Sequence, residues 1–349
     1  MRNALSAQQL SAGQRVKMFI QKSPARMAFI IAGLLYLATI IKTPSSFNAS
    51  AIGSIIMLTL LLSIASAGQT IVLIGGGMDF GVGAVMSSAA ILTTTIMNGE
   101  DGHFLQLLVT ALATGALVGL LNGVCSVKIG LPPMIVTLAI SNVVTRMQYV
   151  LTQGSPMGYA SPTFIKTVTA RLFGLQFLPS IVLYAVVLIP LVFYLLNRSR
   201  FGKQVYLVGN NPTAARLSGV SVARVQILTY VFSGLFAAFA GMLGAAYMNA
   251  ARCQIFDEYA YNSLIAVIIG GTTLSGGVGS YTGSIAGSLV MVVLSNALTT
   301  MGFSQPLRNI FMGLIMVLLL TLRRIPRKRQ KKRRCMKMTP FMRKRNVNP

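Results

Sequence analysis

One acidic residue lies in a glycine-rich interruption between two apolar runs. Asp79 belongs to the stretch Ile74-Gly-Gly-Gly-Met-Asp-Phe-Gly-Val-Gly83, and it is the only acid at the depth of these runs. An ionisable group at such depth costs free energy and is by default a candidate for function. The alternative is a structural role, in which Asp79 caps the helix that follows and the helix N-terminus stabilises its charge. The sequence leaves both roles open.

A second interruption follows the same plan later in the chain, from Ile269 to Ser280. Both stretches pass from an apolar run into Gly-Gly, a short polar insert and Gly-Val-Gly, and both lead into a run rich in small residues. Breaks inside a membrane are tolerated only where they are buried in protein or line a cavity. In transporters, paired breaks often mark the substrate pathway. The pathway candidates are Asp79, Gly77, Gly83, Asn122, Arg146, Gly271 and Gly277.

Two of these candidates lie outside the breaks. Arg146 is the other charge embedded in an apolar run, and it would either pair with Asp79 or face a water-filled cavity. Asn122 is one of several polar residues within the runs, together with Asn142, Gln148 and Asn296. Such residues hold helices together more often than they touch a ligand.

Other chemistries are excluded by residues that the sequence lacks. Neither glycine-rich stretch contains the lysine of a phosphate-binding loop, so we expect the chain itself to bind no nucleotide. The single histidine, His103, and the three cysteines, Cys125, Cys253 and Cys335, follow no metal-binding or disulfide spacing. No catalytic triad or carboxylate pair is recognisable. We therefore predict no enzyme activity, no cofactor and no metal site.

A polar segment from Asn197 to Arg224 separates two apolar runs. It holds five basic residues and no acid. Within it, an asparagine followed by proline predicts a helix N-terminus, and Gly219 predicts a left-handed end to the same short helix. Such a helix indicates a docking element, and a solvated connector is the alternative. The docking candidates are Asn211, Pro212, Ala214, Ala215, Arg216, Leu217, Ser218 and Gly219.

The composition sets the class of protein that must position these residues. The chain of 349 residues is 54% hydrophobic and 10% charged, with a mean hydropathy of +0.70, whereas soluble domains carry about 25% charged residues. Apolar runs recur along almost its whole length, and each approaches the roughly 20 residues that cross a bilayer as a helix. We predict an all-α polytopic membrane protein with about ten transmembrane helices, two of them interrupted by glycine-rich breaks.

The positions of the basic residues predict the topology. We expect the first apolar run to be a retained signal-anchor helix rather than a cleaved signal peptide. With the N-terminus inside, six spans return the chain to the cytoplasm at residues 197–224, and four more place the tail inside. The predicted spans are residues 27–41, 51–74, 81–97, 105–127, 131–152, 175–196, 225–248, 260–274, 281–300 and 306–322.

The net charge of +25 is unevenly distributed. Thirteen of the 30 Lys and Arg residues lie in residues 323–349, which contain no acid. Basic residues beside membrane spans mark the cytoplasmic face and attract anionic lipid headgroups, so we expect a lipid partner and no nucleic acid. The chain thus divides into a basic cytoplasmic segment (1–26), a transmembrane region (27–322) and a basic cytoplasmic tail (323–349).

Four motifs together resemble the permease subunits of bacterial ABC importers for ribose and related monosaccharides. Two of them are the first break, Gly76-Gly-Met-Asp-Phe-Gly-Val-Gly83, and Leu131-Pro-Pro-Met-Ile-Val-Thr-Leu138. The others are Gly209-Asn-Asn-Pro-Thr-Ala-Ala-Arg-Leu-Ser-Gly219, which is similar to the family's cytoplasmic coupling segment, and the second break with its preceding residues from Ala266. The matches are collinear from about residue 50 to residue 322. The departures from the family pattern are Phe80 and Gly81, in place of Leu and Ser, and the long basic tail.

The resemblance implies a permease subunit in the bacterial inner membrane that imports a monosaccharide or related polar solute. It implies three protein partners: a cytoplasmic ATP-binding subunit that docks on the short helix, an extracytoplasmic sugar-binding protein, and a second permease chain, identical or different. Two alternatives stay open, an ion-coupled secondary transporter and a partner of a heterodimeric permease that does not itself contact the solute. The identity of the sugar is not predicted.

Overall fold

A computed structural model describes residues 24–44, 47–155, 158–315 and 317. The described residues form helices and loops, with no strand beyond one isolated bridge between Arg171 and Pro179. The all-α prediction is therefore confirmed. The described residues up to Thr300 form one compact unit, and those from Met301 form a second unit, which contains a helix over residues 305–315. The basic tail, Cys335 and most of the basic N-terminal segment lie outside the described residues.

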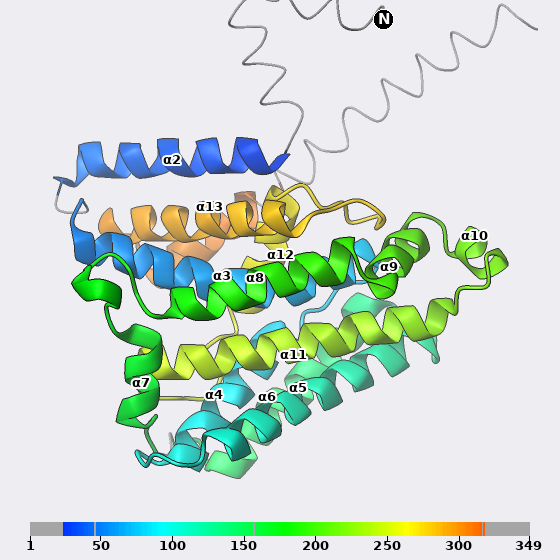
Figure 1. Cartoon of the computed structure of the whole chain (residues 1–349), viewed down its shortest axis with the longest axis horizontal. Helices are drawn as coiled ribbons and strands as arrows, with labels where there is room; N and C mark the ends of the chain where they lie inside the picture. The colour runs from blue at the N-terminus through cyan, green and yellow to red at the C-terminus, as the bar shows by residue number, and fades with distance from the viewer. Residues whose placement is uncertain (1–23, 45–46, 156–157, 316, 318–349) are drawn as a thin grey trace, which may run out of the picture. The chain divides into compact units, whose positions relative to one another are not determined.

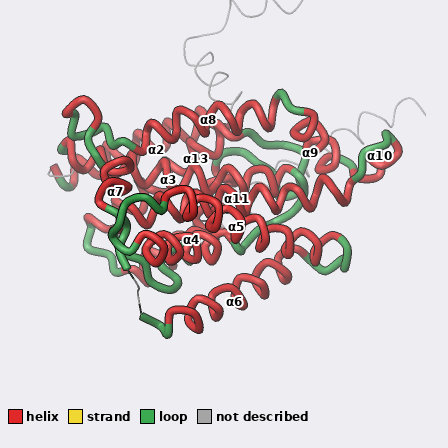
Figure 2. The backbone as a smooth tube through the Cα atoms, turned by 60° about the horizontal axis from the view of Figure 1, so that its bottom comes forward, coloured by secondary structure: helices red, strands yellow, loops and turns green. Residues whose placement is uncertain are grey.

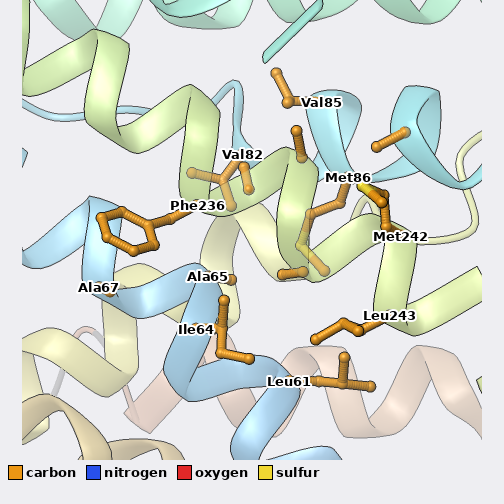
Figure 3. Packing of buried hydrophobic residues seen from close by; sticks show 14 of the residues in the cluster. Leu61, Ile64, Ala65, Ala67, Val82, Val85, Met86, Phe236, Met242 and Leu243 are labelled. Atoms are coloured by element: carbon orange, nitrogen blue, oxygen red, sulfur yellow. The ribbon is translucent and has the colours of Figure 1, made fainter. Parts of the chain in front are cut away.

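Two long helices form the centre of the first unit (Figure 1). These are α3 (Ala49–Ile74), which begins where the Asn48 side chain accepts a hydrogen bond of 2.6 Å from Ala51 N, and α11 (Val222–Met248). Both are buried along most of their length, and α11 packs against α3 and against α4 (Val82–Met97). Figure 3 shows this core, in which Leu61, Ile64, Met86, Met242 and Leu243 come together from the three helices.

Glycines allow the closest helix crossings. Where α5 (Phe104–Val127) crosses α11, a Cβ added at Gly115 or Gly234 would overlap the backbone carbonyl of the other glycine. A Cβ at Gly119 would likewise overlap the Tyr230 carbonyl. In lipid no hydrophobic driving force brings helices together. Small residues favour their association instead, because they allow the backbones to approach closely and pack.

The other helices surround this centre. They are α2 (Pro24–Lys42), α6 (Pro133–Thr152), α7 (Pro162–Thr169), η2 (Leu172–Gly174), α8 (Ile181–Asn197), α9 (Arg200–Asn210), α10 (Pro212–Leu217), α12 (Tyr259–Ile269) and α13 (Tyr281–Thr300). Near the N-terminus, α2 packs through Ala28 and Ala32 on Ala286 and Val290 of α13. In Figure 2, α6 lies along one edge of the unit, and α8 and α9 meet at a bend of 58°.

The predicted spans correspond to helices of unequal length. Six helices in the described residues are long and apolar enough to cross a bilayer, namely α2, α3, α5, α6, α11 and α13, and the bent pair α8–α9 would make a seventh. The apolar helices α4 and α12 are only 16 and 11 residues long, because each borders a glycine-rich break. A total of ten spans stays a prediction.

One predicted span boundary was wrong. Residues 175–180 are a loop rather than the start of a span, because backbone bonds from Leu172 to Leu178 and from Ser180 to Ala170 close a turn there. The polar segment 197–224 holds the predicted short helix, α10, and a further helix, α9, that was not predicted.

The glycine crossing of α5 and α11 generates a stability prediction. Replacing Gly234 by alanine should destabilise the protein by about 1–3 kcal/mol, because the two backbones must separate to admit the methyl group. Thermal unfolding of the detergent-purified protein measures the change. Gly33→Ala on α2 is the matched control, because a Cβ there would meet nothing within 4 Å. Equal melting temperatures for both variants would contradict the close crossing.

Candidate functional site

The first glycine-rich break ends α3 and begins α4. Backbone bonds from Gly75 N to Ile71 O and from Gly77 N to Val72 O close the last turn of α3. This closure requires a left-handed residue, and Gly76 supplies it with φ of +87°. Gly81 is the N-cap of α4 but has no side chain to cap the helix. The N-terminus of α4 therefore needs a capping group from elsewhere.

Asp79 supplies that capping group. Its side chain is 2% exposed, and Oδ1 accepts hydrogen bonds from Gly81 N at 2.8 Å and from Asn122 Nδ2 of α5 at 3.4 Å. The Ser233 hydroxyl of α11 also lies beside the carboxyl group. Two of the predicted pathway residues, Asp79 and Asn122, are thus brought together, and the capping role proposed for Asp79 matches this geometry.

Polar side chains of α5 and α11 enclose the break. We call Asp79, Asn122, Ser126, Tyr230 and Ser233 the Asp79 cluster. The Tyr230 hydroxyl lies next to the Ser126 hydroxyl and the backbone of Met78, and a Cβ added at Gly77 would come within 2.5 Å of its oxygen. A glycine at position 77 therefore allows the Tyr230 hydroxyl to lie close to the backbone of the break. Asn122 Oδ1 and the hydroxyl oxygens of Ser126, Tyr230 and Ser233 are buried with no hydrogen-bond partner among the described residues, so the cluster holds four polar atoms that a ligand could pair with.

Arg146 does not pair with Asp79, which was one of the two roles expected for it. Arg146 is exposed on α6, and its guanidinium lies over the Tyr149 ring at 5.9 Å from the centroid. Helix α6 reaches the break through Thr137 instead, whose hydroxyl accepts a hydrogen bond of 3.2 Å from Phe80 N. Gln148 also joins α6 to α4, because its Nε2 donates to Ala84 O at 2.9 Å.

Gly83 has a packing role in the first turn of α4. A Cβ at this position would come within 2.7 Å of Phe256 O and 2.8 Å of Asp257 O. The same loop is held to α4 by the bond from Phe256 N to Ser87 Oγ, 3.0 Å long. Gly83 therefore contacts the loop between α11 and α12 rather than the Asp79 cluster.

The second break lies directly against the first. Gly271, Gly276 and Gly277 all have positive φ, at +107°, +77° and +73°, so the chain turns sharply between α12 and α13. Gly277 N donates a hydrogen bond of 2.8 Å to Ile74 O, the last residue of α3. A Cβ at Gly276 would lie 3.0 Å from the Cα of Gly76. The similarity of the two stretches in sequence thus corresponds to a contact in space.

The end of α9 also contacts both breaks, and we call the region where α9 and the two breaks meet the junction. Asn210 Nδ2 donates to Gly277 O at 3.3 Å, and the Tyr206 hydroxyl donates to Gly279 O at 2.9 Å. A Cβ at Gly209 would overlap Ile74 O. Sequence reasoning missed α9 and both side chains. The available signals were Ser199, whose hydroxyl caps the helix at Gly202 N, and the buried spacing of Val205 and Val208.

The short helix α10 has the predicted caps. Asn211 Oδ1 accepts from Thr213 N at 3.0 Å and from Ala214 N at 3.1 Å, Pro212 is the first helical residue, and Gly219 has φ of +79°. Figure 1 shows α10 beyond the end of α9 and at the opposite end of the unit from α7. All five basic residues of the segment are exposed, namely Arg198, Arg200, Lys203, Arg216 and Arg224.

The predicted docking residues of α10 do not share one environment. Ala215 is 0% exposed and belongs to the core, whereas Leu217 is 86% exposed. Pro212, Ala214, Arg216 and Ser218 are exposed as well. Arg216 and Leu217 are therefore adjacent exposed side chains on a helix that is fixed to the core through Ala215.

Residues 51–320 match the protein family described as the permease component of the branched-chain amino acid transport system. The chain belongs to this permease family. The ribose import permease protein RbsC of Escherichia coli K12 is 29% identical over 296 residues, which cover 82% of this chain and 90% of the relative. The probable ABC transporter permease protein y4mJ of Sinorhizobium fredii is 29% identical over 311 residues (88% and 92%). The fructose import permease protein FrcC of Rhizobium meliloti is 30% identical over 316 residues (87% and 86%).

No solved structure matches the chain. Family membership and the long apolar helices establish a multi-pass membrane protein that serves as a transport subunit rather than an enzyme. The family match includes both breaks and α10, so the Asp79 cluster and the junction lie within the permease region.

The capping geometry gives a test of Asp79 that separates structure from transport. Asp79→Asn retains an oxygen that accepts from Gly81 N, so its melting temperature should stay close to wild type, whereas Asp79→Ala should cost about 1–3 kcal/mol for the unpaired backbone donor. If the carboxylate also serves the solute, Asp79→Asn should lower uptake severalfold. Normal uptake by a well-expressed Asp79→Asn variant would leave Asp79 as a cap alone.

Proposed function

We propose that the chain is the permease subunit of an ABC importer that carries a monosaccharide across the bacterial inner membrane into the cytoplasm. The observation that carries this proposal is α10, a doubly capped helix with exposed Arg216 and Leu217. It continues from α9, which is hydrogen-bonded to the second break and contacts the start of the first break at Ile74. A secondary transporter has no need of such a docking helix. The names of the relatives, two of which are sugar import permeases, support the solute class.

The chemistry of the Asp79 cluster favours a neutral polyhydroxy solute. A free amino acid carries a carboxylate and an ammonium group, and a binding site for it needs groups of both signs. The cluster supplies one carboxylate, amide and hydroxyl groups, and Arg146 lies outside it. Carboxylate, amide and hydroxyl groups together donate to and accept from sugar hydroxyls. The unused Asn122 Oδ1 is an acceptor that such a solute would satisfy.

Transport would proceed by movement of rigid elements. A cytoplasmic ATP-binding subunit docks on α10, a sugar-binding protein delivers solute to the opposite face, and a second permease chain completes the pathway. Closure of the ATP-binding subunits displaces α10, and packed helices transmit the displacement as rigid bodies. The exposed basic residues around α10 support a cytoplasmic location for this end, because the positive-inside rule favours basic residues on that side.

Uptake measurements test the proposed function. Proteoliposomes containing the permease and the ATP-binding subunit encoded beside it should accumulate a sugar only when ATP and the matching binding protein are present. A panel of ribose, galactose, xylose and arabinose identifies the solute. Uptake that needs no ATP-binding subunit and disappears with the membrane potential would instead identify an ion-coupled transporter.

Helix α10 gives a separate test of docking. Leu217→Asp, Arg216→Glu and Ala214→Asp should each weaken binding of the ATP-binding subunit by about 1–3 kcal/mol, because they alter exposed positions of the docking helix. Co-purification and ATPase assays measure the loss. Lys203→Glu, an exposed charge reversal on α9, is the control and should bind normally. Ala215→Asp is unsuitable as a test of docking, because a carboxylate at this buried position would destabilise the fold itself. Undiminished binding by all three variants would exclude α10 as the docking element.

A further inference from the structure

We propose that Tyr206 and Asn210 of α9 are positioning residues, which hold the second break to α9 so that displacement of the docking helix reaches the Asp79 cluster. This inference rests on the proposed function, since it concerns how the movement of α10 is transmitted. It assigns a role in coupling to two side chains through their hydrogen bonds to the second break.

The two side chains act from one face of α9. They are four residues apart, which places them one above the other on a helix. Each donates to a backbone carbonyl of the second break, Tyr206 to Gly279 at 2.9 Å and Asn210 to Gly277 at 3.3 Å. A helix that holds a non-helical segment at two points controls both its position and its tilt. With only one of these bonds, the orientation of the segment relative to α9 would be less firmly fixed.

The second break is built to move as one piece. Thr273 N donates to Val278 O at 3.0 Å, Gly276 N donates to Thr273 O at 3.1 Å, and the Thr273 hydroxyl donates to Gly276 O at 3.0 Å. These bonds close the segment on itself. Because its backbone groups are paired within the turn, a pull on Gly277 or Gly279 displaces the turn as a unit rather than unravelling it.

At the junction, the backbone of α9 is in direct contact with the start of the first break. A Cβ at Gly209 would overlap both Ile74 O and Gly277 N, so the backbones of α9, α3 and the second break are in direct contact. Gly277 N is bonded to Ile74 O at 2.8 Å, and Ile74 is followed at once by the break that carries Asp79. A displacement of α9 therefore passes through the second break to the end of α3 and then to the Asp79 cluster.

Helix α9 is directly continuous with the docking helix. Asn210 is its last residue, and Asn211, the N-cap of α10, donates its own N–H to Leu207 O at 3.1 Å. The donor Asn210 thus stands one residue from the start of the helix that the ATP-binding subunit would move. At its other end, α9 meets α8 at a bend of 58°, so the two helices do not form one continuous rigid rod.

A purely structural role makes a different prediction from a positioning role. If the two bonds only stabilised the fold, their loss would reduce complex yield, ATP hydrolysis and uptake together. If they transmit movement, ATP hydrolysis should continue while less sugar is moved per ATP. The ratio of sugar transported to ATP hydrolysed is therefore the informative quantity.

Tyr206→Phe removes one hydroxyl and keeps the ring, so the fold should survive. The assay uses reconstituted complexes with the binding protein, ATP and the sugar of the panel that the wild type takes up best. We expect Tyr206→Phe and Asn210→Ala to lower the sugar moved per ATP by about fivefold each. Melting temperature and assembly should stay close to wild type. The controls are Tyr194→Phe, a tyrosine of α8 that is 62% exposed, and Asn197→Ala at the end of α8, and both should transport normally.

An unchanged ratio of sugar to ATP in both variants would overturn the inference. A parallel fall in assembly, hydrolysis and uptake would overturn it too, because it would indicate a structural role. These results differ from failure of the proposed function, which would appear in the wild type as an absence of ATP-driven uptake and would remove the basis of the inference.

Discussion

The hydrogen bond from Gly277 N to Ile74 O is the contact on which the rest of the arrangement depends. The last carbonyls of a helix have no partner within the helix, and inside a membrane no water replaces that partner. The first break itself bonds the carbonyls of Ile71, Val72 and Leu73, but the donor for Ile74 O comes from the second break, some 200 residues later in the chain. The two breaks therefore pair a backbone donor with a backbone acceptor and fix one another's position. This pairing allows two non-helical segments to lie side by side at this depth.

The position of Asp79 follows from this pairing and from the crossing of α5 with α11. The pairing fixes where the first break leaves α3, and the uncapped N-terminus of α4 draws the carboxylate inward to Gly81 N. The α5–α11 crossing can be as close as it is because glycines face backbone there, and this brings Asn122 and Ser233 to the same carboxyl group. Capping and solute contact are compatible roles for Asp79, since one oxygen can cap while the rest of the cluster stays polar.

What the sequence predicted correctly was local. The left-handed closure of α10 by Gly219, its Asn211 cap and the helix breaks all follow from backbone preferences of single residues. What it missed depends on tertiary contacts. Pairing of Arg146 with Asp79 assumed a proximity that no local pattern encodes, and the burial of Ala215 depends on how a six-residue helix packs on its neighbours. Helix α9 was not predicted, because it is only 11 residues long and contains two basic residues, so its sequence does not resemble a membrane span.

Two routes lead from α10 to the Asp79 cluster. One passes through α9 and the paired breaks, as described above. The other passes through α11, which begins at Val222 just after α10 and carries Tyr230 and Ser233 into the cluster. The bond from Val220 N to Ala215 O, 3.0 Å long, and the buried Ala215 side chain hold α10 to the start of α11. Because both routes end at the same carboxyl group, a displacement of α10 that moved α9 and α11 differently would change the distance between the break and the side chains that enclose it. That distance is the quantity on which access to a buried polar site would depend.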